Sequence, residues 1–199
     1  MKTVVALTLG MLLASSALAE LPQKTNEVFV GAGSGPVLFV VEEVGDVFVD
    51  VLFHGGGSYR SESSGGEQLV AGFQHRFNRW LGAGVSGSWA KTSEDLYRLG
   101  EDQKLSTTTR QMVTLQLDGR LHWTDWPWGG LYSTVGLGVA SRHYKYTDFV
   151  HDYEIPHNWA HVAMNLVPLG VRLGSDVGGT LEIGGFTNSV VTGGLSYRF

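Results

Sequence analysis

The sequence contains no cysteine, and this absence excludes disulfide bonds and zinc or iron–sulfur sites with cysteine ligands. Charged residues make up only 17% of the chain, and the formal net charge is −5. A mildly acidic chain with so few charges is a poor partner for nucleic acid. Beyond residue 19 there is no run of roughly 18 uncharged apolar residues, so no transmembrane helix is predicted.

Other features of the composition are positive. The hydrophobic share of 43% excludes an intrinsically disordered chain, and 199 residues predict a single domain. Glycine is abundant, with 28 residues, but it does not follow the triplet repeat of collagen. The chain is therefore expected to be a folded, glycine-rich domain.

The N-terminus has the pattern of a secretory signal peptide. Lys2 is the only charge before Glu20, residues 4–13 form a short apolar core, and small residues precede a cleavage point after Ala19. The apolar core is too short to span a bilayer, which takes roughly 20 residues. We expect residues 1–19 to be a signal peptide and residues 20–199 to form the exported domain.

The C-terminal segment alternates in polarity. Val191, Leu195, Tyr197 and Phe199 share one strand parity, and polar residues or glycine occupy the other. Side chains of a strand alternate between its two faces, so this segment suits a wall between lipid and a polar interior. Tyr197 and Phe199 are expected to lie in an aromatic girdle.

Seven further segments alternate in a similar way, and the shortest of them is 180–186. The eight predicted strands are residues 26–33, 67–77, 80–91, 108–122, 130–146, 158–173, 180–186 and 191–199. Pro168 is expected to mark a bulge in the sixth of them.

The connections between these segments alternate in length. Those at 34–66, 92–107 and 147–157 are long, whereas those after the second, fourth and sixth strands are short. An even strand number, short turns on one side and long loops on the other are typical of bacterial outer-membrane barrels. The predicted fold class is all-β, an eight-stranded antiparallel up-and-down transmembrane β-barrel. Its glycine-rich inner face fits a narrow barrel filled by side chains.

Residues 36–53 leave two alternatives open. Valines at helical spacing and an acidic stripe of Glu42, Asp46 and Asp50 favour a short amphipathic helix. The many valine and phenylalanine residues favour strands, which would bring the barrel to ten. The helix is the preferred prediction.

The chain resembles a known family in several places. These are residues 26–31 followed by 36–53, the strand–turn–strand around 77–80, residues 168–172 and the end 193–199. On these segments it resembles small bacterial outer-membrane β-barrel proteins of the OmpA/OmpX type and, more closely, an uncharacterised family of outer-membrane β-barrel proteins. The resemblance covers nearly the whole exported domain.

This resemblance implies a fold and a location. The expected location is the outer membrane, with outer-membrane lipid and the barrel assembly machinery as partners, the latter recognising a last strand that ends in Tyr197 and Phe199. The resemblance implies no catalytic residue and no cofactor.

Four histidines are the weak candidates for metal ligands. They lie within one segment together with Asp148, Asp152 and Glu154, a set that could bind a metal such as zinc. Their spacing matches no metal motif, and a polar outer loop explains them as well, so no metal site is predicted. The histidines are His143, His151, His157 and His161.

Catalysis on lipid A is a second possibility. It would need a serine activated by a histidine. The sequence has no His-x-Ser pair and no Gly-x-Ser-x-Gly motif, and Ser58 and Ser64 lie in a segment that we interpret as a Gly/Ser-rich linker. We therefore predict no enzyme activity.

Eight charged residues are predicted to face the lumen. Buried charges must pair, so their mixed signs predict a salt-bridge network that plugs the barrel. The alternative is a narrow gated ion path. The residues are Glu27, Arg76, Arg110, Asp118, Arg120, Arg172, Glu182 and Arg198.

The expected function follows from these points. We predict an outer-membrane β-barrel of structural or interaction type, whose outer loops contact surface partners. The alternatives are a membrane enzyme acting on lipid A or another outer-membrane lipid, and the gated ion path.

Overall fold

The computed structural model describes residues 24–34, 59–98, 104–149, 153–186 and 189–199. The predicted signal peptide (1–19), the predicted helix at 36–53 and the candidate ligand His151 lie outside the described residues. Within these ranges, no helix is long and apolar enough to cross a membrane.

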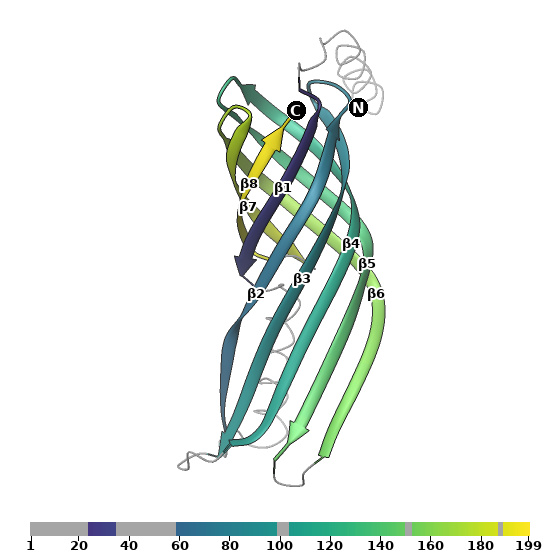
Figure 1. Cartoon of the computed structure of the whole chain (residues 1–199), viewed down its shortest axis with the longest axis vertical. Helices are drawn as coiled ribbons and strands as arrows, with labels where there is room; N and C mark the ends of the chain where they lie inside the picture. Colours follow the sequence, from purple (N-terminus) through teal and green to yellow (C-terminus); the bar gives the residue numbers. More distant parts are fainter. Residues whose placement is uncertain (1–23, 35–58, 99–103, 150–152, 187–188) are drawn as a thin grey trace, which may run out of the picture.

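The described residues form eight strands that close into an antiparallel barrel in sequence order (Figure 1). The predicted all-β, eight-stranded fold is therefore confirmed. The strands are β1 (Asn26–Ser34), β2 (Tyr59–Arg76), β3 (Leu81–Arg98), β4 (Lys104–Trp126), β5 (Gly129–Asp148), β6 (Tyr153–Leu173), β7 (Val177–Phe186) and β8 (Val191–Arg198).

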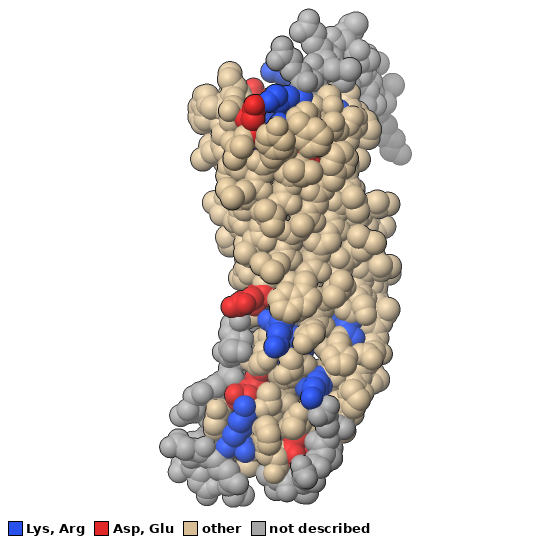
Figure 2. Space-filling view, viewed as in Figure 1, with Lys and Arg blue, Asp and Glu red and all other residues tan. Residues whose placement is uncertain are grey.

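The two faces of the wall have opposite polarity. Most of the buried side chains are polar or charged, whereas most of the large apolar side chains are exposed on the outside. A soluble protein shows the reverse distribution. In the view of Figure 2, charged side chains gather toward the two ends of the molecule and leave a belt without visible charge between them.

The strands differ greatly in length. β1, β7 and β8 have 9, 10 and 8 residues, whereas β2 to β6 have between 18 and 23. The five long strands continue past the others as a curved sheet (Figure 1). We call this part the extension, and it comprises residues 59–66, 92–98, 104–110, 142–148 and 153–159. The predicted long loops at 92–107 and 147–157 are therefore largely wrong, because β3 to β6 run through most of them.

The residues in these segments explain the difference. Thr107, Thr108 and Thr109 are β-branched and favour strands, and each pairs with both β3 and β5. In this part of the sheet polar residues lie on both faces, so the alternation of polarity that marks the rest of the wall disappears there. Ser64, which we interpreted as part of a flexible linker, also lies within β2, next to a register shift.

Short turns and the described chain ends share the other end of the barrel. In the first turn the side-chain oxygen of Asn78 accepts hydrogen bonds from the backbone N–H groups of Trp80 and Leu81, both at 2.8 Å. Gly174 enters the β6–β7 turn with a φ of +122°, a conformation that favours glycine. Asn26 and Phe199 exchange backbone hydrogen bonds and join the first strand to the last.

The predicted bulge at Pro168 is confirmed. Between Leu166 and Leu169 the register of β6 against β7 shifts, and its register against β5 shifts between Tyr132 and Thr134. Proline has no N–H group to donate to a neighbouring strand, which favours a bulge at this position.

Candidate functional site: the charged lumen

A cluster of charged side chains fills the lumen at the end that carries the short turns. Glu27 of β1 lies at its centre, because three arginines from three other strands surround its carboxylate. The Glu27 oxygens lie 2.7 Å from Arg198 Nε, 3.5 Å from Arg120 Nη1 and 3.7 Å from Arg172 Nε. The negative charge of Glu27 is thus shared among β4, β6 and β8.

Two further carboxylates extend the cluster. Asp125 bridges Arg76 at 3.1 Å and Arg198 at 3.6 Å. Glu182 lies 3.6 Å from Arg120 Nη2. The cluster therefore alternates in charge across the lumen, as buried charges require.

Aromatic and neutral polar groups complete the surroundings of the arginines. The guanidinium of Arg120 lies 4.1 Å from the ring centroid of Tyr132, and the Tyr132 hydroxyl donates a 2.7 Å hydrogen bond to Glu182. Arg172 is fully buried and donates to the Ser196 hydroxyl and to the backbone carbonyls of Gly174 and Asp176. Arg172 thereby holds the β6–β7 turn against β8.

Strand β3 contributes space instead of charge. Its inward positions at this level are Gly82, Gly84 and Ser86. On the neighbouring β2, a Cβ at Gly72 would lie 2.5 Å from the ring of Phe29, which faces Arg120. Small residues at these points leave the lumen free for the long arginine side chains. Seven of the eight strands supply a polar side chain to the cluster, and β3 makes room for them.

Two of the predicted lumen charges make no ion pair in the cluster: Arg110 lies apart from it, whereas Asp118 lies beside it, two residues before Arg120. Arg110 pairs with Glu94 at 3.2 Å in the extension. It precedes Arg120 by ten residues on β4, which at roughly 3.3 Å per residue is about 33 Å along the strand. Asp118 is buried, and its Oδ1 atom has no hydrogen-bond partner. The structure brings together the other six: Glu27, Arg76, Arg120, Arg172, Glu182 and Arg198.

Sequence reasoning missed two members of the cluster, Asp125 and Tyr132. Simple alternation from the inward residue His122 places Asp125 outside. A bulge between His122 and Thr124 inserts Trp123, and this insertion turns Asp125 inward, where it pairs with Gly130 in register. Tyr132 has the inward parity in the sequence, but nothing there indicates that its hydroxyl meets a carboxylate.

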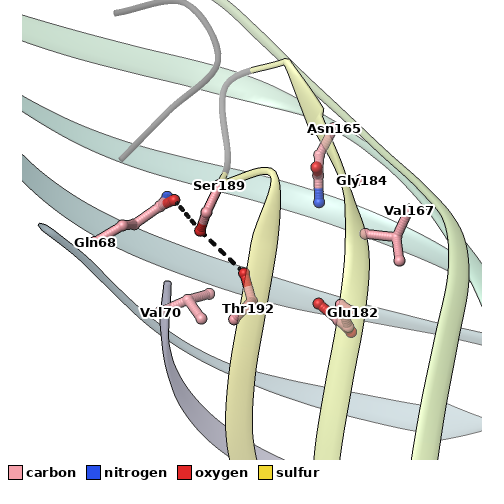
Figure 3. A pocket seen from close by; sticks show the side chains of 8 residues that line it. All are labelled: Gln68, Val70, Asn165, Val167, Glu182, Gly184, Ser189 and Thr192. Atoms are coloured by element: carbon pink, nitrogen blue, oxygen red, sulfur yellow. Dashed lines mark hydrogen bonds between the residues drawn. The ribbon is translucent and has the colours of Figure 1, made fainter. Parts of the chain in front are cut away.

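A small cavity lies between the cluster and the rims of β7 and β8. It measures about 10 Å³, room for a single water molecule, and is lined by polar groups of Gln68, Asn165, Glu182, Ser189 and Thr192 (Figure 3). Ser189 Oγ donates to Gln68 Oε1 at 2.7 Å and lies 3.0 Å from Thr192 Oγ1. These bonds tie the end of the 187–188 connection to β2 and β8.

The structure separates the histidines that we considered as metal ligands. His143 pairs in register with Asn158, its Nδ1 lies 2.5 Å from Asn158 Oδ1, and both are exposed on the outer face. His157 and His161 have the opposite parity on β6 and face the inner side with Tyr144 and Ala140. Among the described residues, no group of three histidine, aspartate or glutamate side chains is placed to hold a metal ion.

Aromatic side chains ring the outside of the barrel at the turn end. Trp126 and Trp128 stack with their ring centroids 5.3 Å apart, and Tyr197 and Phe199 stack at 5.8 Å. All four are exposed to the surroundings of the barrel. Aromatic side chains in this position suit a membrane interface.

Comparison with known proteins gives distant matches among solved structures. No protein-family model and no curated protein matches the chain. The solved structures that match include two of Ail, the attachment invasion locus protein of Yersinia pestis, one of them in complex with the heparin analogue sucrose octasulfate. The identities are 12% and 13%, and the alignments cover 89% of this chain and 100% of Ail. With TM-scores of 0.49 and 0.45, the chain is similar to Ail only at a distance.

Proposed function

We propose that this protein is an outer-membrane barrel with a plugged lumen, which displays the β2–β6 extension to partners outside the membrane. The observation that carries this proposal is the difference in strand length. Three strands end where the apolar outer face ends, and five continue into polar sequence.

The apolar belt on the outer face ends sharply on the side of the extension. Large apolar side chains on the outer face include Leu69, Trp89, Val113, Val139 and Val162, all exposed. The next polar row beyond them follows the register of the sheet from strand to strand. It consists of Glu67, Lys91, Gln111, His143 and Asn158. Beyond this row the extension would stand in water.

The extension offers a surface that a partner can recognise. Ile155 and Trp159 of β6 are 51% and 52% exposed, although they lie outside the apolar belt. The guanidinium of Arg142 lies 5.3 Å from the centroid of the Trp159 ring system. Arg142 itself is only 5% exposed, so Ile155 and the half-exposed Trp159 supply the surface, and the positive charge beside the indole ring favours an acidic sugar.

The plug argues against an ion path. A narrow barrel has no aqueous channel when its interior is filled by side chains. Four arginines converge on Glu27 and Asp125, and Glu182 pairs with one of them, so charged side chains cross the lumen from several strands. We therefore assign the charge cluster a structural role.

Site-specific labelling tests the proposed arrangement, because the chain has no cysteine of its own. Lys145→Cys places a thiol on the extension, and Asp176→Cys places one in a short turn at the other end. In intact cells a membrane-impermeant maleimide should label the first variant and leave the second unlabelled until the outer membrane is broken. Equal labelling of both variants, or the reverse order, contradicts the proposal.

A second experiment tests the barrel and its surface. Refolded protein should migrate differently on a gel before and after boiling, as closed barrels do.

Heparin is a suitable probe for an acidic sugar, and Trp159→Ala should weaken its binding. Asn158→Ala, which alters the opposite face of the same strand, is the matched control. If both variants bind heparin as the parent does, the surface around Arg142 and Trp159 is not the binding surface.

A further inference from the structure

An open apolar groove runs along the outer face where the barrel closes. It has a volume of about 390 Å³ and is formed by β1, β7 and β8, which lie side by side in Figure 1. The residues that line it are Val28, Phe29, Val30, Val177, Leu195, Ser196 and Tyr197. The side chains of Phe29 and Ser196 face the lumen, and the other five are apolar or aromatic and exposed, so the groove opens to whatever surrounds the barrel.

Two glycines lie beside the residues that line the groove, on the same outer face of the wall. Gly179 of β7 pairs with Leu195 and shares its outward face, and Gly193 of β8 pairs with Leu181 and Ala32. An ideal Cβ at Gly193 would meet no atom within 4 Å, and one at Gly179 would meet only the Gly194 carbonyl oxygen at 4.0 Å. At these two positions beside the groove the wall therefore carries no side chain, although the backbone leaves room for one.

A pair of opposite charges lies at the turn end of the groove. Lys24 Nζ lies 2.5 Å from Asp176 Oδ1, and both side chains are well exposed. Asp176 directly precedes Val177, which lines the groove, and Lys24 precedes the start of β1 by two residues. The stacked rings of Tyr197 and Phe199 are at the same end, at the expected level of the membrane interface.

We propose that this groove binds one phospholipid with a zwitterionic, amine-bearing headgroup. One acyl chain lies in the groove, its phosphate approaches Lys24, and its ammonium group approaches Asp176. An anionic headgroup without an amine would satisfy Lys24 but would place its negative charge against Asp176. This inference rests on the proposed function, because it needs the outer face to meet a bilayer.

The shape of the wall supports a specific site over general lipid contact. Elsewhere the outer face carries side chains such as Leu115, Leu117 and Leu137, which project into the lipid. At Gly179 and Gly193 the wall recedes instead, so an acyl chain there contacts side chains on both sides as well as the backbone beneath it. One acyl chain therefore makes more van der Waals contacts with the protein here than on the rest of the outer face, and it binds correspondingly more tightly.

Native mass spectrometry of the folded barrel tests the proposal. The protein is refolded into vesicles of phosphatidylethanolamine, phosphatidylglycerol and phosphatidylcholine in equal parts, then released in mild detergent. We expect one retained phosphatidylethanolamine per barrel. Gly179→Leu places a side chain beside Val177 and Leu195 at the edge of the groove, and it should lower the retained fraction about tenfold, which corresponds to 1.4 kcal/mol. Lys24→Gln combined with Asp176→Asn should remove the preference among the three lipids.

Gly119→Leu is the matched control. Gly119 lies on the outer face of β4, away from the groove, and a Cβ there would meet only the Val135 carbonyl oxygen at 3.9 Å. This variant should retain lipid as the parent does. Equal loss in Gly119→Leu and Gly179→Leu overturns the site, and equal retention of phosphatidylglycerol overturns the headgroup assignment. A parent protein that inserts into vesicles but retains no lipid overturns the site alone, whereas failure to insert overturns the proposed function.

Discussion

Arg198 and Glu27 are register partners on the last and first strands, and Arg198 Nε donates to Glu27 Oε2 at 2.7 Å. The two residues are 171 positions apart in the sequence. Their ion pair lies at the seam where the barrel closes. Glu27 also faces Arg120 and Arg172, so this seam is joined through one carboxylate to β4 and β6.

Glu27→Ala should therefore destabilise the barrel strongly. The substitution leaves three arginines without their shared counter-charge inside the lumen. Removing one partner of a buried ion pair costs about 3–5 kcal/mol, because the remaining charge stays buried. Urea unfolding of the vesicle-inserted protein, followed by tryptophan fluorescence, measures the free energy of unfolding.

An exposed ion pair provides the control. Lys104 lies 2.8 Å from Asp95 in the extension, and both side chains are about one-third exposed. Lys104→Ala should cost less than about 1 kcal/mol, as exposed pairs do. A loss in Glu27→Ala no larger than in Lys104→Ala would show that the cluster does not hold the barrel closed.

Two glycines on β3 should respond differently to alanine. A Cβ at the inward Gly84 would overlap the carbonyl oxygen of Phe73 and lie 2.8 Å from Gln74 Nε2. At the outward Gly87 the nearest atom, the Thr114 carbonyl oxygen, is 3.5 Å away, an ordinary contact. Gly84→Ala should destabilise the barrel by about 1–3 kcal/mol through overpacking. Gly87→Ala should be neutral or stabilise it by up to about 1 kcal/mol.

The urea midpoints of the two variants, compared under the same conditions, decide this prediction. Similar midpoints would mean that the lumen can widen to accept a methyl group at Gly84. The charge cluster would then have more freedom than its distances indicate.

The sequence was sufficient to predict the closed part of the barrel because its apolar outer face and its polar lumen impose opposite demands on alternate residues. Val28 and Glu27, or Leu117 and Asp118, show this contrast directly. The extension has no such regular contrast, since polar residues lie on both of its faces, and so the alternation predicts loops where the structure has strands. A pattern of polarity cannot mark a strand that meets the same solvent on both sides.

The charge cluster was predictable in part for a related reason. Parity gave the inward position of Glu27 and Arg120, and the need to neutralise buried charge gave the expectation that they pair. Parity could not give Asp125, because the bulge at Trp123 reverses the alternation after it. Parity could not separate Arg110 from the cluster either. Alternation shows which face of the strand a residue is on, but it does not show the position of that residue along the barrel axis.

The tip of the extension should be sensitive to acid through Asp95. The hydrogen bond from Lys104 lowers the pKa of Asp95 below its ordinary value, and a 3.0 Å hydrogen bond from the Thr107 hydroxyl acts in the same direction. The folded state therefore holds the proton less tightly than the unfolded state does. The resulting stabilisation is fully present above the unfolded pKa and is lost as the pH falls through the folded pKa.

Hydrogen exchange at the β3–β4 tip measures this effect. After correction for the intrinsic rates, exchange of the backbone amides near Asp95 and Thr107 should accelerate between pH 6 and pH 3, by an amount that stays small because solvent reaches and screens the pair. Asp95→Asn cannot lose a charge, so its corrected exchange should be nearly independent of pH over this range. If the variant accelerates as much as the parent protein, the acid sensitivity of the tip arises from another group.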